Sequence, residues 1–194
     1  MRIEIRIAGF GGQGVILAGV TVAQAAGVYA DLEVAQTQSY GPEARGGACK
    51  CDVVTSSNRI LYPKVQKPSV LVAMSQPALD KYASDADPEK TVLVVDSSLV
   101  SEVPAGFARV VKVPATDIAE KTFGKRVVAN MVILGAVAAA APEVLPLTAL
   151  ACAINDMVNP RFRDLNQQAV KAGFAAVTGA GGATATEVSP DEAL

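Results

Sequence analysis

The most constraining feature of this sequence is the glycine-rich turn GFGGQG at residues 9–14, which separates two segments of different periodicity. Residues 2–8 carry isoleucine at every second position, which is typical of a strand with one buried face. Residues 14–27 are apolar on nearly every side, which indicates a helix buried on more than one side. A strand, a glycine turn and a helix in this order predict the start of a βαβ unit.

Residues 33–38 supply the second strand of that unit, which should run parallel to the first with a right-handed crossover. Residues 48–55 alternate and predict another strand, and residues 59–62 can return as its hairpin partner. The other expected strands are residues 69–74, 91–96 and 109–113, and the other expected helices are residues 77–83, 116–124, 126–141, 147–158 and 162–177.

This order of elements predicts an α/β fold, a Rossmann-like open and mainly parallel sheet with helices on both faces and an inserted β-hairpin. The expected organisation is a single domain over residues 1–178. Residues 179–194 are small and polar, so we expect a flexible C-terminal tail there.

The composition excludes several classes of function. The chain has no histidine, so it cannot by itself carry a Ser-His-Asp triad or a histidine metal site. Its net charge of −2 does not favour a nucleic-acid partner. Three cysteines are too few for a four-thiolate iron–sulfur cluster or a disulfide framework, so we expect a cytoplasmic protein. The longest apolar run, residues 131–141, is too short to span a membrane.

The turn itself can be interpreted in two ways. Gly9, Gly11 and Gly14 satisfy G-x-G-x-x-G, and free N–H groups at the start of the following helix favour an anion such as phosphate. The same glycines could serve only to pack a strand against a helix. Ordinary NAD binding is disfavoured, because Asp31 and Glu33 lie at the start of the second strand rather than at its end.

A second glycine-rich segment, YGPEARGG at residues 40–47, leaves the carboxyl end of the second strand. In a parallel sheet that edge also carries the first turn, so the two loops should converge on one crevice. Arg45 could bind phosphate or carboxylate there, and Tyr40 could stack or donate a hydrogen bond. Alternatively, Arg45 pairs with Glu43 or packs in a subunit contact, and Glu43 is a solvated loop charge.

The remaining candidate residues have structural interpretations at least as good as functional ones. Cys49 and Cys51 point to one face of a strand and are expected to be small core residues, as is Cys152 within an apolar helix. Asp96 ends a buried strand at the ligand edge and could join a site. Ser97 beside it could equally act as a helix cap.

Three segments together resemble a known family: GFGGQG at 9–14, YGPEARGG at 40–47 and NMVILG at 130–135. Over roughly residues 1–155 the chain resembles the γ subunit of the 2-oxoacid:ferredoxin oxidoreductases, of the pyruvate, 2-oxoglutarate and ketoisovalerate type. That resemblance implies a part of an enzyme that oxidatively decarboxylates a 2-oxoacid to an acyl-CoA and passes electrons to ferredoxin or another acceptor. It also implies that thiamine diphosphate and iron–sulfur clusters reside on partner subunits.

The resemblance and the turn chemistry together predict that this chain helps to bind coenzyme A and hold the complex together, without a catalytic residue or a metal ligand of its own. The expected coenzyme A-binding residues are Gly9, Gly11, Gly12, Gln13, Gly14, Tyr40, Arg45, Gly46 and Gly47. Two alternatives stay open, a purely structural assembly subunit and a free-standing dinucleotide-binding oxidoreductase.

Overall fold

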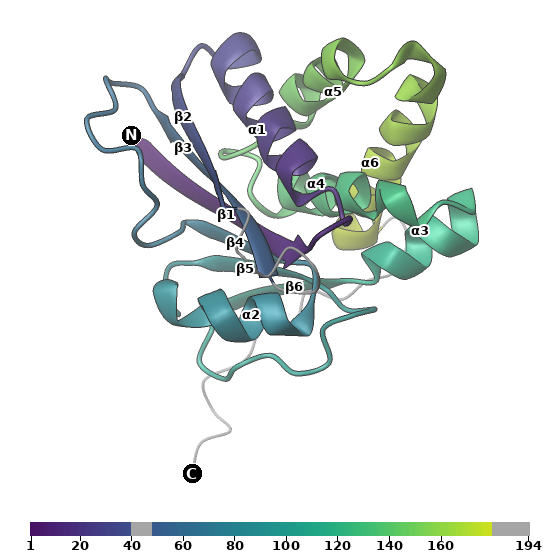
Figure 1. Cartoon of the computed structure of the whole chain (residues 1–194), viewed down its shortest axis with the longest axis horizontal. Helices are drawn as coiled ribbons and strands as arrows, with labels where there is room; N and C mark the ends of the chain where they lie inside the picture. The colour runs from purple at the N-terminus through teal and green to yellow at the C-terminus, as the bar shows by residue number, and fades with distance from the viewer. Residues whose placement is uncertain (40–47, 180–194) are drawn as a thin grey trace.

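A computed structural model describes residues 1–39 and 48–179 of the chain (Figure 1). One six-stranded sheet has the order β2-β3-β1-β4-β5-β6. Its strands are β1 (Arg2–Phe10), β2 (Glu33–Ser39), β3 (Ala48–Ser56), β4 (Val70–Ala73), β5 (Val92–Asp96) and β6 (Arg109–Val113). The helices are α1 (Val15–Tyr29), α2 (Gln76–Tyr82), α3 (Ala115–Phe123), α4 (Ala129–Ala140), α5 (Leu147–Met157) and α6 (Arg163–Thr178), with short 3-10 helices η1 (Ala83–Asp85), η2 (Arg126–Val128) and η3 (Pro160–Phe162).

Helices cover both faces of the sheet, as the sequence predicts, but unequally (Figure 1). The larger core lies between one face and helices α1, α3, α4, α5 and α6, and it receives Ile3, Ile5 and Ile7 of β1. A smaller core on the opposite face packs α2 against β4 and β5. The α/β class is therefore confirmed, in a mixed sheet in which β1, β4, β5 and β6 run parallel and β3 runs antiparallel to both its neighbours.

The position of β3 differs from the prediction. β1 and β2 run in the same direction, as expected, but β3 lies between them and pairs with both. The hairpin expected between residues 48–55 and 59–62 is wrong, because β3 forms its hairpin with β2, and residues 59–62 are not a strand. β3 is buried on both faces and carries Asp52 opposite Arg6 of β1.

The pairing of Arg6 with Asp52 gives a physical reason for this order. The Arg6 guanidinium is 2% exposed and donates from Nε to Asp52 Oδ1 at 2.7 Å and from Nη2 to Asp52 Oδ2 at 2.9 Å. A buried guanidinium without a carboxylate partner costs several kcal/mol, on the order of 3–5 when one member of a buried pair is removed. Pairing β1 with β3 brings the two charges together.

Two helices of the larger core touch backbone to backbone. At the crossing of α4 and α6, a Cβ added to Gly135 would lie 2.0 Å from the Val170 carbonyl oxygen, and one added to Gly173 would lie 1.8 Å from the Val132 carbonyl oxygen. Only glycine allows this separation. The crossing fixes α4, whose first turn borders the glycine turn.

Candidate functional site at the glycine turn

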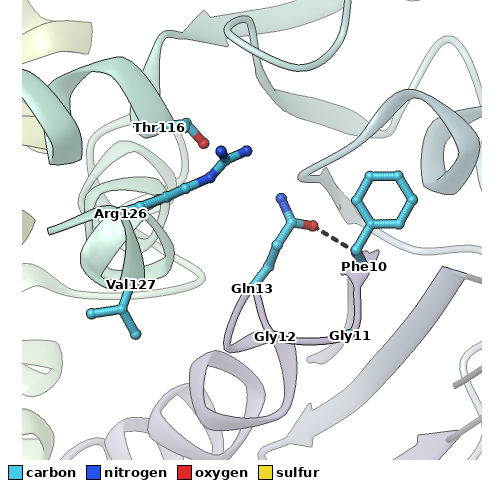
Figure 2. Close-up of a pocket in the computed structure, with 8 residues that line it drawn as sticks. Phe10, Gly11, Gly12, Gln13, Thr116, Arg126 and Val127 are labelled. Carbon is cyan, nitrogen blue, oxygen red and sulfur yellow. Dashed lines mark hydrogen bonds between the residues drawn. The ribbon is translucent and has the colours of Figure 1, made fainter. Parts of the chain in front are cut away.

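The glycine turn lies at the edge of the sheet where the parallel strands β1, β4, β5 and β6 all end. A pocket of about 370 Å³ opens beside it (Figure 2). The pocket is lined by Phe10, Gly11, Gly12, Gln13, Thr116, Arg126, Val127 and Ala129. Open α/β sheets bind ligands at this edge, so the pocket is the first candidate for a functional site.

Both polar atoms of the Gln13 side chain bind the backbone, so this side chain holds the turn to the sheet and does not offer a free polar group to a ligand. Its Oε1 accepts a hydrogen bond from the Phe10 N–H at 2.6 Å, and its Nε2 donates to the Met74 carbonyl at 2.8 Å. A Cβ on Gly9 would lie 2.5 Å from Gln13 Oε1. Gln13 therefore joins the ends of β1 and β4, and Gly9 leaves room for its side chain.

The end of the turn is held by α4. Gly14 has φ +71° and is the N-cap of α1, and Asn130 Nδ2 donates to its carbonyl oxygen at 3.2 Å. A Cβ on Gly14 would lie 2.4 Å from Asn130 Nδ2. Asn130 is buried, and its Oδ1 accepts from the Met131 N–H at 2.9 Å. The first and third of the three sequence segments thus contact each other directly.

The start of α1 has the properties of an anion site. Gly14 provides no side-chain cap, and the first turn of the helix contains no acidic residue. Gly11 and Gly12 are exposed, and a Cβ on Gly12 would meet nothing within 4 Å. Uncapped N–H groups and the positive end of the helix dipole favour a negatively charged ligand. Gly12, with φ +93°, leaves space for such a ligand to approach the backbone closely.

The sequence analysis did not identify Arg126 as a site residue. Figure 2 shows its guanidinium in the space between Thr116 and Gln13. Its ion pair with Glu120, at 3.5 Å, joins two side chains that are 60% and 49% exposed, and such surface pairs contribute little. The guanidinium therefore remains available to an anion in the pocket. No signal in the neighbouring sequence distinguishes Arg126 from the adjacent Lys125.

Comparison with known proteins identifies the family. Residues 4–176 match the family described as pyruvate ferredoxin/flavodoxin oxidoreductase. The chain belongs to this family. It is 45% identical to the 2-oxoglutarate synthase subunit KorC of Methanothermobacter thermautotrophicus, over 89% of this chain and 94% of that protein. The resemblance noted in the sequence is confirmed.

Solved structures of the oxidoreductase family show the same fold. The γ subunit of a keto/oxoacid ferredoxin oxidoreductase from Geobacter sulfurreducens is 41% identical, with a TM-score of 0.78 over 89% of this chain and 96% of that one. A 2-oxoglutarate:ferredoxin oxidoreductase from Magnetococcus marinus, solved with 2-oxoglutarate, coenzyme A and succinyl-CoA, has a TM-score of 0.77 at 24% identity, over 97% of this chain and 32% of that one. This chain is thus homologous to γ subunits of multisubunit 2-oxoacid:ferredoxin oxidoreductases, complexes that contain thiamine diphosphate and iron–sulfur clusters.

Four of the residues predicted for the oxidoreductase's coenzyme A site, Tyr40, Arg45, Gly46 and Gly47, lie outside the described residues. The strands that flank them are informative. Ser39 of β2 pairs with Lys50, and Ala48 of β3 pairs with Phe10, the last residue of β1. β2 therefore ends, and β3 begins, at the edge of the sheet that carries the glycine turn. Convergence of the two loops themselves stays a prediction.

Two acidic residues considered from the sequence are not at the ligand surface. Asp96 is fully buried and accepts from the Thr116 N–H at 3.1 Å and the Thr116 hydroxyl at 2.6 Å, so it caps α3. Glu33 pairs with Ser56, at the end of the sheet opposite to the glycine turn. Glu33 is therefore not placed to serve as the ribose-binding acid that a dinucleotide site carries at the end of the second strand.

The cysteines of this family member do not form a cluster site. Cys51 is buried, as expected, and accepts from Gln36 Nε2 at 2.9 Å, while burial raises the pKa of both Cys49 and Cys51. The expectation that Cys152 is a core residue is wrong: it is exposed, because the buried side of α5 is formed by other residues, Ala149, Leu150, Ala153 and Ile154. Among the described residues, no group of three or more His, Cys, Asp or Glu side chains could hold a metal ion.

None of the helices in residues 1–39 and 48–179 has the length and apolar character that crossing a bilayer needs.

Proposed function

We propose that this chain is the γ subunit of a 2-oxoacid:ferredoxin oxidoreductase complex, where it helps to bind coenzyme A and to hold the complex together. The observation that carries the proposal is the pocket at the uncapped start of α1, which Arg126 faces from η2. The KorC relative is named as a subunit of 2-oxoglutarate synthase, so 2-oxoglutarate is the substrate that we propose for the whole complex.

Coenzyme A fits the chemistry of this pocket. Its pyrophosphate would accept hydrogen bonds from backbone N–H groups at the start of α1, and Gly12 would allow a phosphate oxygen to approach the chain. The Arg126 guanidinium supplies a planar set of donors that suits phosphate oxygens. Arg45, if the two loops converge, would add a second cation from the 40–47 segment.

The chemical steps require groups that this chain does not offer. It has no histidine, and no metal-binding cluster was found among its described residues. We therefore assign decarboxylation to thiamine diphosphate and electron transfer to iron–sulfur clusters on partner subunits. The role of this chain is to bind and orient coenzyme A, whose thiol would extend to a neighbouring subunit. Its free cysteines fit a complex that works in the reducing cytoplasm.

The test is a steady-state comparison in the assembled complex. Arg126→Ala should raise KM for coenzyme A by roughly tenfold or more, since a charge-assisted hydrogen bond contributes about 1.5–3 kcal/mol. KM for the 2-oxoacid should not change, because in this proposal the oxoacid reacts on a partner subunit. Lys90→Ala is the matched control, since Lys90 is an 81% exposed cation remote from the pocket.

Two results would count against the phosphate site. An unchanged KM for coenzyme A in the Arg126→Ala complex would overturn it. Loss of assembly with an unchanged KM in the complex that remains would favour the purely structural alternative. Measuring KM at two salt concentrations adds a second criterion, because the contribution of an exposed cation should shrink as salt rises.

A further inference from the structure

The connection between β3 and β4, residues 57–69, has no helix or strand, but β1 holds it through several hydrogen bonds. Glu4 Oε2 accepts hydrogen bonds from the Gln66 N–H at 2.7 Å and the Lys67 N–H at 3.1 Å. Arg2 Nη2 donates to the Lys64 carbonyl at 3.2 Å. These contacts use the polar face of β1, so the strand fixes the loop along its own length.

Further contacts hold both ends of this loop. Val65 is buried, with 7% of its surface exposed, and the carbonyl oxygen of Val65 accepts a hydrogen bond from Nη2 of the buried Arg6 at 3.4 Å. At the other end, the Ser57 N–H donates to the Met1 carbonyl at 3.1 Å. These contacts hold the loop on both sides of residues 59–63, so only a short segment has conformational entropy to lose on binding.

The tip of the loop, residues 59–64, exposes apolar side chains instead of covering them. Leu61 is 85% exposed, the largest exposed fraction among the large apolar side chains of the described residues, and Tyr62 beside it is 47% exposed. A single exposed leucine is ordinary on a protein surface. Adjacent leucine and tyrosine side chains on a short segment that is held at both ends are different, because aromatic and aliphatic anchors are typical of binding hot spots.

The exposed charges of residues 59–67 are all positive, and Glu4, whose carboxylate contacts this loop, already pairs with Arg2 at 2.8 Å. Arg59, Lys64 and Lys67 are exposed, and between Asp52 and Asp80 the sequence contains no acidic residue. Within the described part of the chain, none of these three cations has an ion pair. The surface therefore combines an apolar centre with a basic rim, and its complement is an apolar recess bordered by carboxylates.

This surface is separate from the glycine turn. Arg2 pairs with Ser56, the last residue of β3, at the amino end of β1, whereas the glycine turn follows its carboxyl end. Figure 1 shows the β3–β4 connection beside the amino terminus and away from the start of α1. A molecule bound at one surface leaves the other open.

We propose that the 59–64 tip is a docking surface for another subunit of the same complex, one that presents an apolar recess bordered by acidic side chains. We choose a protein partner because the backbone is held on both sides of the tip and because Leu61 and Tyr62 are exposed side by side. We choose an acidic partner because Arg59, Lys64 and Lys67 have no ion pair among the described residues. The partner is taken from the proposed function, in which this chain is one of several subunits.

The first experiment identifies the occupant. A photo-reactive benzoylphenylalanine placed at Leu61 in the assembled complex should cross-link to another subunit, at a peptide rich in Asp and Glu. The same probe at Val28, a 60% exposed residue at the end of α1, controls for random capture. A cross-link at Leu61 to a second copy of this chain only, or no cross-link, would overturn the proposal.

The second experiment measures the contribution of the tip. Leu61→Ser combined with Tyr62→Ser should weaken assembly by roughly tenfold or more, as loss of a hot-spot pair does. Lys64→Glu should weaken it in a salt-dependent way, and Val28→Ser should not weaken it. KM for coenzyme A in the complex that still assembles should stay unchanged, which separates this surface from the glycine-turn site.

A basic, apolar loop could also contact a lipid surface, and a direct assay decides between the two. Vesicles containing phosphatidylserine should not retain the assembled complex in a flotation assay. Retention that depends on Leu61 and Tyr62, with unchanged subunit affinity, would replace the proposed partner with a membrane.

Discussion

Gly135→Ala tests the α4–α6 crossing on which the position of the glycine turn depends. In an isolated helix this substitution is favourable by about 1 kcal/mol, because alanine has the higher helix propensity. In this protein the added Cβ would lie 2.0 Å from the Val170 carbonyl oxygen and 2.9 Å from the Phe174 nitrogen. Both obstacles are backbone atoms, so no side-chain rotation relieves them.

The expected cost follows from these distances. The carbon–oxygen separation in close backbone contacts is about 3.3 Å, so the two helices must move apart by roughly 1.3 Å at this point. Overpacking of a well-packed core costs about 1–3 kcal/mol, and a rigid backbone obstacle belongs at the upper end. After the gain in propensity is subtracted, Gly135→Ala should destabilise the protein by about 2 kcal/mol. Gly173→Ala, with its Cβ at 1.8 Å from the Val132 carbonyl oxygen, should cost at least as much.

Thermal unfolding followed by circular dichroism measures this effect. For a chain of this size, a loss of 2 kcal/mol lowers Tm by about 4–8 °C. Gly27→Ala in α1 is the control, because its nearest neighbour is Val34 Cγ2 at 3.3 Å, the end of a side chain that can move. The control should not lower Tm and can raise it by up to about 2–4 °C, because the gain in helix propensity meets no backbone obstacle. A Gly135→Ala protein as stable as the wild type would refute the backbone contact between α4 and α6.

Three further predictions concern the glycine turn and the thiols. Asn130→Ala removes the side chain that holds Gly14 and should raise KM for coenzyme A several-fold with a smaller change in kcat, as measured by steady-state kinetics of the complex. In the folded chain, Cys152 should react with a maleimide before the other two cysteines, because it is exposed while burial raises the pKa of Cys49 and Cys51. Mass spectrometry after a short labelling time measures this order, and faster labelling of another cysteine would contradict the prediction. Because these pKa values are raised in the folded state, the thiols lose their protons at lower pH in the unfolded state than in the folded state. Their contribution to the free energy of unfolding should therefore be fully present below about pH 9, the ordinary thiol pKa, and should be lost as pH rises through the higher pKa values of the folded state. Cys51→Ala should lose less stability than the wild type between pH 8 and pH 11 in urea titrations, and an equal loss in both proteins would contradict the assignment.

The parts of the fold that the sequence predicts well are local. The alternation in β1, the glycine turn and the apolar α1 are adjacent in the chain, and the left-handed Gly124 ends α3 where a C-terminal glycine is expected. The placement of β3 is not local. It depends on the ion pair between the buried Arg6 of β1 and Asp52, which lies 46 residues later. The sequence around either residue does not indicate which residue is its partner.

The candidate site has the same division. Gly11 and Gly12 could be located from the turn pattern, but the roles of Gly9, Gln13 and Gly14 depend on Met74 and Asn130, which reach the turn only in three dimensions. Arg126 was assigned to a helix start, and nothing in its neighbourhood indicates that η2 borders the pocket. Cys152 was assigned to the core from the apolar character of its helix, although its own side of α5 faces outward.

The central position of β1 also has a consequence for how the chain is made. β1 leaves the ribosome before both of its neighbours, because Phe10 pairs with Ala48, 38 residues later, and Ile5 pairs with Val70, 65 residues later. At about 5–20 residues per second, the isoleucine-rich strand waits roughly 2–13 seconds before both of its neighbours have been synthesised. Closing such long loops is slow, and an unpaired apolar strand is prone to aggregate. Nascent chains of this protein should therefore depend on a chaperone until β4 has emerged.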